Sequence, residues 1–411
     1  MERIGWDGEC GELPVLQEDF AAVAAAAEGD LGRLAGSTLL VVGADGLLGG
    51  GVVRALAWCR RYGLPAPERL LAVVDAVRPG DAPASPALGE GVEVFEIGPG
   101  APLPDGIEAQ FAVLAPGPPE VADPADPLLA IEGPTARLRR VLAWAERQPR
   151  LEGLLLVSDA DVYGSLPTAE LPVAEDARPG RLGPIQAAGA AAAHRYCEAL
   201  ALAAARGRGV PVRVARAFHV YGPGLGLDSG TVIADFLRDR LAGGPIRLRA
   251  DGDRVRSFCY LADALGGLLG VLVRGRSGEV FNLGNDRETV TVAELARMVA
   301  RIEPPRLRAV PLETPPPARL AESPRRLVPD CSRARHLLGY TPRVSLPEGL
   351  RRTLRWLREA GLAAEAPLPE RVSASDSALV PRAFASMRRP CTSVLRPLRP
   401  EPGAPGRSKA L

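Results

Sequence analysis

Three glycines with a fixed spacing follow a short apolar run near the start of the chain. Gly43, Gly46 and Gly49 come directly after residues 39–42 and open a helical segment. The first permits a tight turn, the second lets the backbone approach a pyrophosphate, and the third allows close packing of helix on strand. Because the helix amino terminus then faces the phosphates, this order predicts a dinucleotide-binding turn. The alternative is that the glycines serve packing only.

Acidic residues near the ends of the next two predicted strands bear on which dinucleotide is bound. Asp75 ends the strand at residues 70–74, where a carboxylate can accept hydrogen bonds from the adenosine ribose hydroxyls. It would repel a 2′-phosphate, which favours NAD over NADP as the cofactor. Glu96, near the end of the third strand, either contacts the adenine or is an ordinary exposed acid. Asp45 adds a negative charge near the turn.

Strand and helix patterns alternate around these residues. Apolar runs predict strands at residues 39–42, 70–74, 92–97, 111–115, 154–157 and 212–215. Helical patterns cover residues 51–61 and a long Ala-rich segment at residues 187–206. This alternation predicts an α/β fold, a Rossmann-type doubly wound parallel sheet with a smaller C-terminal substrate lobe.

Four parts are expected along the chain. Residues 1–36 form an N-terminal helical preface, and residues 37–220 form the Rossmann domain. Residues 221–362 form a mixed α/β lobe, with some elements interleaved. Residues 367–411 are rich in Pro, Ser and Arg without periodicity, which predicts a disordered tail.

Composition argues against several classes of protein. The 411 residues carry a formal net charge of +1, so nothing global favours nucleic acid or an anionic membrane as a partner. No apolar run reaches the ~18 residues of a membrane span, and residues 21–27 lack the basic start of a signal peptide. We therefore expect a cytoplasmic protein. The six scattered cysteines contain no CxxC pair, so neither a disulfide framework nor a metal site is expected.

Motifs in the second half of the chain resemble those of the extended short-chain dehydrogenases/reductases, the NAD-dependent epimerase/dehydratase family. Residues 214–224, V-A-R-A-F-H-V-Y-G-P-G, look like its R-x-F-N-x-Y-G-P segment. Residues 252–263 resemble its G-x-G-x-x-R-S-F-x-Y-V-x-D, residues 281–285 its N-L-G-N, and residues 329–342 its P-D-I-x-x-A-x-x-x-L-G-W-x-P. With the glycine spacing, the resemblance covers roughly residues 37–358. It is closest to UDP-glucuronate decarboxylases, with dTDP-glucose 4,6-dehydratases and UDP-sugar 4-epimerases near.

The resemblance implies a protein that binds NAD and a nucleotide-sugar. It places Arg256 against the substrate diphosphate, because a planar guanidinium donates to two phosphate oxygens at once. The alternative for Arg256 is a structural salt bridge. His219 replaces the Asn of R-x-F-N, which makes it a second candidate for substrate binding. The helix at residues 187–206 resembles those through which the family forms dimers, so we expect a homodimer or a heterodimer with a homologue.

The residues that run the family's chemistry are absent. In the family a Tyr phenolate removes a proton from a sugar hydroxyl while NAD accepts the hydride, and a Lys four residues later lowers the Tyr pKa. Aligned backward from residues 212–216, the Tyr position is Ala190 and the Lys position is His194. The only Lys in the chain is Lys409, and the catalytic hydroxyl position is Asp159.

Two hypotheses follow from these replacements. In the first, the chain is a nucleotide-sugar enzyme with an altered acid–base pair, because His194 could titrate near neutrality beside Asp159. In the second, it is a non-catalytic sensor or the partner subunit of an active homologue, and His194 is a partly exposed helix residue. Standard sugar oxidation is not expected, since the missing general base is worth ~10²–10⁴ in rate.

Overall fold

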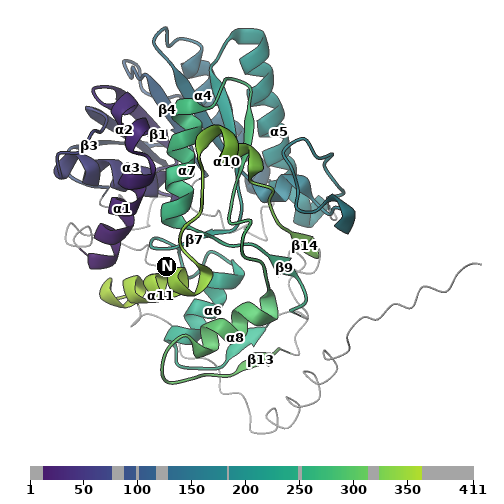
Figure 1. Cartoon of the computed structure of the whole chain (residues 1–411). Helices are drawn as coiled ribbons and strands as arrows, with labels where there is room; N and C mark the ends of the chain where they lie inside the picture. Colours follow the sequence, from purple (N-terminus) through teal and green to yellow (C-terminus); the bar gives the residue numbers. More distant parts are fainter. Residues whose placement is uncertain are drawn as a thin grey trace, which may run out of the picture. The chain divides into compact units, whose positions relative to one another are not determined.

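A seven-stranded parallel sheet forms the centre of the computed structural model (Figure 1). The structure describes residues 13–75, 88–98, 101–116, 128–182, 185–248, 252–312 and 324–362, so the predicted tail lies outside it. From edge to edge the strands are β11 (Val280–Leu283), β6 (Val212–Ala217), β5 (Gly153–Asp159), β4 (Phe111–Leu114), β1 (Thr38–Val42), β2 (Arg69–Asp75) and β3 (Val92–Ile97). The predicted Rossmann-type doubly wound sheet is confirmed.

Side chains alternate between the two faces of this sheet, and each face has its own apolar core. In β1, Leu39 and Val41 join one core, whereas Leu40 and Val42 join the other. The first face is covered by α3 (Leu47–Arg61) and α7 (Leu261–Arg274), and the second by α4 (Leu129–Ala145) and α5 (Ile185–Arg208). Because both faces are covered, the central strands are continuous apolar runs in the sequence.

The strand order reverses between β1 and β4. From β1 the sheet continues through β2 and β3 to one edge, and from β4 it continues through β5, β6 and β11 to the other. The connections that follow β1 and β4 therefore run away from the centre of the sheet in opposite directions. They open a crevice at the carboxyl ends, which is where doubly wound sheets bind ligands.

A smaller lobe contains three short sheets. They pair β7 (Val220–Tyr221) with β10 (Cys259–Tyr260), β8 (Ile246–Leu248) with β13 (Ala309–Pro311), and β9 (Val255–Arg256) with β12 (Val290–Thr291) and β14 (Arg326–Leu327). The remaining helices here are α6 (Val232–Leu241), α8 (Val292–Arg301), α10 (Ser332–Leu338) and α11 (Leu346–Glu359). Two 3₁₀ helices, η2 (Ala160–Tyr163) and η3 (Thr168–Glu170), follow β5. Since β11 and α7 come from this half of the sequence but join the main sheet layers, the two halves interleave.

Two N-terminal helices, α1 (Pro14–Ala26) and α2 (Glu28–Leu34), pack on α7. Two buried acids anchor them. Asp30 pairs with Arg274 through bonds of 2.7 and 2.9 Å. Asp19 accepts a bond from the Tyr260 hydroxyl at 2.6 Å and one from Arg352 of α11 at 2.9 Å. The N-terminal helices thereby connect the sheet layers to the lobe.

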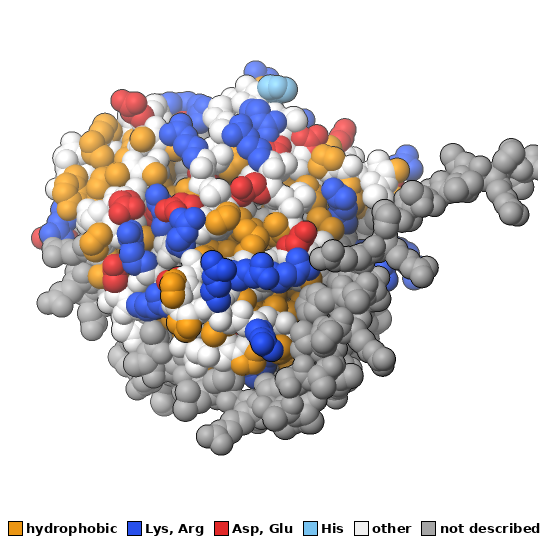
Figure 2. All heavy atoms as spheres, turned by 60° about the horizontal axis from the view of Figure 1, so that its bottom comes forward, with side chains coloured by type: hydrophobic (Ala, Val, Ile, Leu, Met, Phe, Trp, Pro, Cys, Tyr) orange, Lys and Arg blue, Asp and Glu red, His pale blue; other side chains and the backbone are white. Residues whose placement is uncertain are grey.

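Acidic and basic side chains are interspersed on the face drawn in Figure 2. The arginines of α11 pair with nearby acids, Arg352 with Glu348 at 2.9 Å and Arg355 with Glu18 at 3.1 Å. Such exposed pairs add little stability, but they balance charge locally. Within the part of the chain that the structure describes, no helix has the length and apolar character needed to cross a membrane.

Replacing Asp19 with Asn should change how stability depends on pH. Burial raises the pKa of Asp19 to about 6 from an ordinary 3.8, against the lowering effect of its bonds from Tyr260 and Arg352. Between these values the folded chain keeps a proton that the unfolded chain has released, so rising pH lowers the free energy of unfolding. We expect wild type to lose up to about 3 kcal/mol relative to Asp19→Asn between about pH 4 and about pH 6.

Urea unfolding of both proteins from about pH 4 to about pH 7 measures this difference. Asp105→Asn, at an exposed position, is the control for the loss of a carboxyl group. A difference between wild type and Asp19→Asn that stays constant over this range would contradict the prediction.

Candidate functional site

The turn after β1 has the backbone geometry that a pyrophosphate-binding turn needs. Gly43 has a φ of +82°, a left-handed conformation that residues with a Cβ rarely adopt. A Cβ on Gly49 would lie 2.2 Å from the Gly43 carbonyl oxygen, so only glycine lets α3 approach this closely. Gly46 precedes the first residue of α3, and no side chain caps this 15-residue helix. Its first amides can therefore donate to an anion.

Asp45, between the first two glycines, directs its carboxylate toward the end of β2. Its Oδ2 accepts a long bond of 3.4 Å from the Asp75 amide. Its Oδ1 is buried and has no partner among the described residues. Burial, and then the charge of Asp75, raises the pKa of Asp45. The surroundings of Asp45 therefore disfavour its ionised form, and so they disfavour the negative charge expected beside the phosphates.

Asp75 ends β2, but its carboxylate is not isolated. Arg137 of α4 donates to Oδ2 through Nε at 2.9 Å and through a terminal nitrogen at 2.7 Å. Arg140 donates to Oδ1 at 3.3 Å. The expected preference for NAD over NADP depends on an isolated carboxylate. In the structure the Asp75 carboxylate is instead bound by two arginines. Sequence reasoning missed both arginines, although their spacing of three residues places them on one helix face.

Glu96 is not brought together with Asp75. In the β2–β3 register Glu96 lies opposite Val74, whereas Ile97 lies opposite Asp75. Because neighbouring residues of a strand point to opposite faces, Glu96 and Asp75 are on different sides of the sheet. Glu96 is also exposed. This placement favours the plainer of its two interpretations, an ordinary strand-end acid.

The helix α5 carries the two positions at which the sequence predicts an altered catalytic pair. Ala190 is exposed, and His194, one turn later, is half-buried. Burial lowers the pKa of His194, although the charges of Asp161 and Glu198 act in the opposite direction. The ring is therefore neutral at pH 7. It can accept a proton, but it supplies no positive charge.

Asp159 has a local structural role. Its Oδ1 accepts the Asp161 amide at 2.7 Å and so caps the short helix η2. Asp161 is the acid whose charge acts most on His194. The structure thus favours Asp161 over the predicted Asp159 as the acid beside His194. The sequence feature that could have identified Asp161 is that it is a second acid, two residues after Asp159 in the same turn.

A buried polar network holds α5 against the sheet. Arg216 of β6 makes a bidentate ion pair with Glu198 of α5, with bonds of 2.7 and 3.0 Å. Another guanidinium nitrogen donates to the Tyr163 hydroxyl at 2.7 Å, and this hydroxyl donates to Oδ1 of Asn282 in β11 at 2.7 Å. Burial raises the pKa of Tyr163 to about 12. This phenol therefore stays protonated and does not replace the missing base.

His219 has an unusual backbone and an unpaired ring nitrogen. Its φ of +43° is the one positive value at a non-glycine residue among those described, and its ring packs on Phe258. Burial, followed by the charge of Arg256, lowers its pKa to about 3. A hydrogen bond with the Ser257 backbone raises this pKa, so the ring donates it. Because Nδ1 has no partner among the described residues, it is a buried acceptor that a ligand could satisfy.

Arg256 is buried in β9. Its guanidinium donates to the carbonyl oxygens of Pro324 at 2.7 Å and of Val255 at 2.8 Å. Burial lowers its pKa to about 10, so it remains charged at pH 7. Carbonyl acceptors carry no net charge, and the positive charge of Arg256 acts on His219. The structure therefore brings the two predicted substrate-binding residues close enough to interact.

Comparisons with known proteins show which proteins this chain is similar to. Residues 122–284 match a family model described as the NAD dependent epimerase/dehydratase family. UDP-glucuronic acid decarboxylase 6 of Arabidopsis thaliana is 31% identical over 201 residues, 48% of this chain and 55% of that protein. UDP-glucuronic acid decarboxylase 1 of the same plant is 38% identical over 158 residues, 38% of this chain and 35% of that protein. The chain spans about half or less of the length of these relatives.

Solved structures share the fold. An epimerase from Methanothermobacter thermautotrophicus matches with a TM-score of 0.67 and 21% identity, over 84% of this chain and 98% of that one. A UDP-glucuronic acid 4-epimerase from Bacillus cereus, in complex with UDP-glucuronic acid and NAD, matches with a TM-score of 0.62 and 21% identity, over 78% and 99%. The family match therefore covers residues 122–284, less than half of the chain, and the solved structures show a likeness in fold over most of it.

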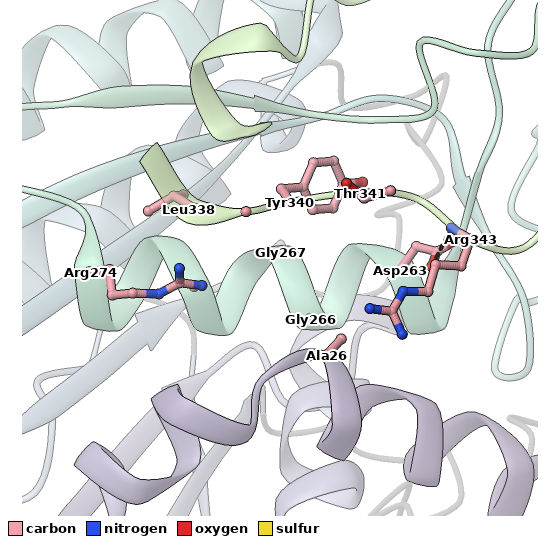
Figure 3. Close-up of a pocket in the computed structure, with 11 residues that line it drawn as sticks. Ala26, Asp263, Gly266, Gly267, Arg274, Leu338, Tyr340, Thr341 and Arg343 are labelled. Carbon is pink, nitrogen blue, oxygen red and sulfur yellow. Dashed lines mark hydrogen bonds between the residues drawn. The ribbon is translucent and has the colours of Figure 1, made fainter. Parts of the chain in front are cut away.

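One pocket among the described residues lies between α1, α7 and the segment after α10 (Figure 3). Its glycines serve packing, since a Cβ on Gly266 would lie 3.1 Å from the Ala26 side chain and one on Gly267 would lie 2.8 Å from the Tyr340 ring. The Asp263 carboxylate accepts the Arg343 amide at 3.0 Å. The pocket is therefore a seam between packed segments, and it carries no predicted site residue.

The thiols among the described residues are held in unreactive forms. The described cysteines are buried free thiols, and burial raises the pKa of each: Cys59, Cys197, Cys259 and Cys331. A protonated buried thiol is a poor nucleophile. The described residues also contain no His, Cys, Asp and Glu cluster able to hold a metal ion.

Removing the Glu198 side chain should strongly destabilise the chain. Glu198→Ala leaves the Arg216 guanidinium buried without its carboxylate, and breaking such a pair costs about 3–5 kcal/mol. Glu146→Ala, directly after the last residue of the neighbouring helix α4, is the matched control. It removes an ion pair with Arg208, whose side chain is 66% exposed, and should cost less than about 1 kcal/mol. Denaturant unfolding measures both losses, and equal losses would show that the buried network does not hold α5.

Proposed function

We propose that this chain binds NAD(H) and a nucleotide-sugar at the carboxyl ends of its sheet, and that it does not oxidise common sugar substrates at an appreciable rate. The observation that carries the proposal is the make-up of α5. Ala190 stands exposed at the position of the family's base, and His194, at the position of its Lys, is neutral.

The glycine turn supports the dinucleotide part of the proposal. Gly43, Gly46 and Gly49 would hold the pyrophosphate at the uncapped amino terminus of α3, and Asp75 would lie beside the adenosine ribose. The Bacillus cereus relative was solved with NAD. Bound NAD would supply a hydride acceptor. The chain's own contribution is to bind and orient it.

Arg256 and His219 support the nucleotide-sugar part. The charge of Arg256 would attract a diphosphate, while the neutral Nδ1 of His219 would accept a hydrogen bond from a ligand hydroxyl or amide. The relatives are named for UDP-glucuronic acid, which belongs to this chemical class. Because Arg256 also donates to backbone carbonyls, it has a structural role in addition.

Sugar oxidation needs a base at the hydroxyl while hydride leaves the carbon. Ala190 has no ionisable group, and the Tyr163 hydroxyl is fixed in the buried network. His194 could accept the proton, with Asp161 as the nearby acid. It cannot at the same time supply the permanent positive charge of the missing Lys. The site therefore supports ligand binding more strongly than turnover.

A role as a partner subunit is favoured by the outer side of α4 and α5. Tyr196 of α5 is 41% exposed and contacts Arg139 of α4. These two helices pack side by side (Figure 1), and two such pairs can associate as a four-helix bundle. The partner would be a second copy of this chain or an active homologue. A non-catalytic sensor of NAD or nucleotide-sugar needs no such partner, so sedimentation of the chain alone and with a homologue separates these roles.

We expect negligible 4-epimerase, 4,6-dehydratase or decarboxylase activity with UDP- and dTDP-sugars. The double variant Ala190→Tyr/His194→Lys should recover some hydride transfer, because it restores the base and the charge that lowers its pKa. Ala190→Phe/His194→Lys, which lacks the hydroxyl, is the matched control and should stay inactive. Absorbance of transient NADH across a nucleotide-sugar panel is the measurement.

Robust turnover by wild type would show that the inactive assignment is wrong. If His194→Ala then abolished this turnover, together with Asp159→Ala or Asp161→Ala, an altered acid–base pair would be established. The second and third variants would also decide which acid acts.

Arg256→Ala should weaken binding of a nucleoside diphosphate such as UDP by about 1.5–3 kcal/mol, the scale of a charge-assisted hydrogen bond. Calorimetry measures the loss. Arg325→Ala is the control, since its side chain is 84% exposed. Thermal melting checks that both variants fold, and unchanged UDP affinity in folded Arg256→Ala would assign Arg256 a structural role only.

A further inference from the structure

The Asp75 carboxylate is held at both oxygens by arginines of α4. Arg137 bonds Oδ2 at 2.7 and 2.9 Å, and Arg140 reaches Oδ1 at 3.3 Å. An isolated carboxylate at this strand end accepts ribose hydroxyls and repels a 2′-phosphate, which selects NAD. Two guanidiniums at the same carboxylate remove the basis of that repulsion.

Burial fixes this arrangement. The side chains of Arg137 and Arg140 are 11% and 6% exposed, compared with 26% for Asp75. Arg140 also reaches the carbonyls of Gly98 and Ala101 at the end of β3, through long bonds of 3.4 Å. Its Nε is buried and has no partner among the described residues. A buried donor without an acceptor is costly, so the described residues leave one hydrogen-bonding group of this cluster unsatisfied.

The charge balance points the same way. Asp75 and two guanidiniums together carry a net positive charge, and the ionisation of nearby Asp45 is opposed by burial. An arginine near this strand end is the feature that accommodates a 2′-phosphate in dinucleotide-binding folds. The planar fork of arginine donates to two phosphate oxygens at once. The glycine turn does not discriminate, because NAD and NADP share the pyrophosphate that it would bind.

Building on the proposed dinucleotide-binding function, we propose that Arg137 and Arg140 cancel the selectivity of Asp75, so that the turn accepts NADP(H) at least as well as NAD(H). Arg137, the more exposed of the two, contacts the 2′-phosphate. Arg140 is a positioning residue that holds Asp75 against α4. The choice between NAD(H) and NADP(H) is then decided by α4, on the second face of the sheet, rather than by β2, which carries Asp75.

Calorimetric titration of the full chain with NAD⁺ and with NADP⁺ tests this proposal. Wild type should bind NADP⁺ at least as tightly as NAD⁺. Arg137→Ala should weaken NADP⁺ binding by about 10- to 100-fold, while NAD⁺ affinity stays within about threefold. Arg139→Ala is the matched control and should change neither affinity, because Arg139 lies on the same helix but contacts Tyr196 on its outer side.

Two results would overturn the proposal. The first is NAD⁺ binding at least about tenfold tighter than NADP⁺ in wild type, the behaviour of an isolated carboxylate. The second is an unchanged ratio of the two affinities in Arg137→Ala, which would make Arg137 a structural clamp. The wild-type ratio decides the first point even if the variant does not fold. Binding of neither dinucleotide would instead overturn the proposed function, and this inference with it.

Discussion

The bidentate ion pair between Glu198 and Arg216 fixes the helix on which any chemistry of this fold would depend. Both side chains are largely buried, and a desolvated pair is tolerated only when its remaining hydrogen-bonding groups are satisfied. Tyr163 and Asn282 contribute to this by extending the network to η2 and β11. Because its members come from four separate elements, the network sets how α5 lies against the sheet. The positions of Ala190 and His194 follow from it.

The requirements of the scaffold and of the reactive positions can be separated physically. Glu198 cannot be lost without leaving a buried charge unpaired. Ala190, in contrast, is exposed and leaves no polar group unsatisfied, so the fold does not require a polar residue there. The same holds at the turn after β1, where Gly43 and Gly49 are required by backbone conformation and close packing whether or not a dinucleotide binds. The binding architecture of this fold therefore does not depend physically on an ionisable residue at position 190.

The N-terminal helices add stabilising contacts that the topology of the main sheet does not require. Asp19 reaches Tyr260, immediately before α7, and Arg352 of α11, so a single carboxylate joins three elements. Asp30 joins α2 to the far end of α7. Since α7 covers the first face of the sheet while its sequence neighbours belong to the lobe, these contacts stabilise the junction beside the crevice.

Local patterns in the sequence determined the sheet, its flanking helices and the glycine turn, because strand burial and backbone conformation depend on near neighbours. They also led to the prediction that Ala190, His194 and His219 depart from the motifs that the chain resembles. Only the tertiary structure decided the surroundings of the predicted acids. Arg137 lies 62 residues from Asp75, and their contact arises from packing of α4 on the sheet. The β2–β3 register, which short-range patterns do not encode, turned Glu96 to the opposite face. Charge partners and facing directions are set by elements distant in sequence, and so the selectivity of the site could not be derived from its motif.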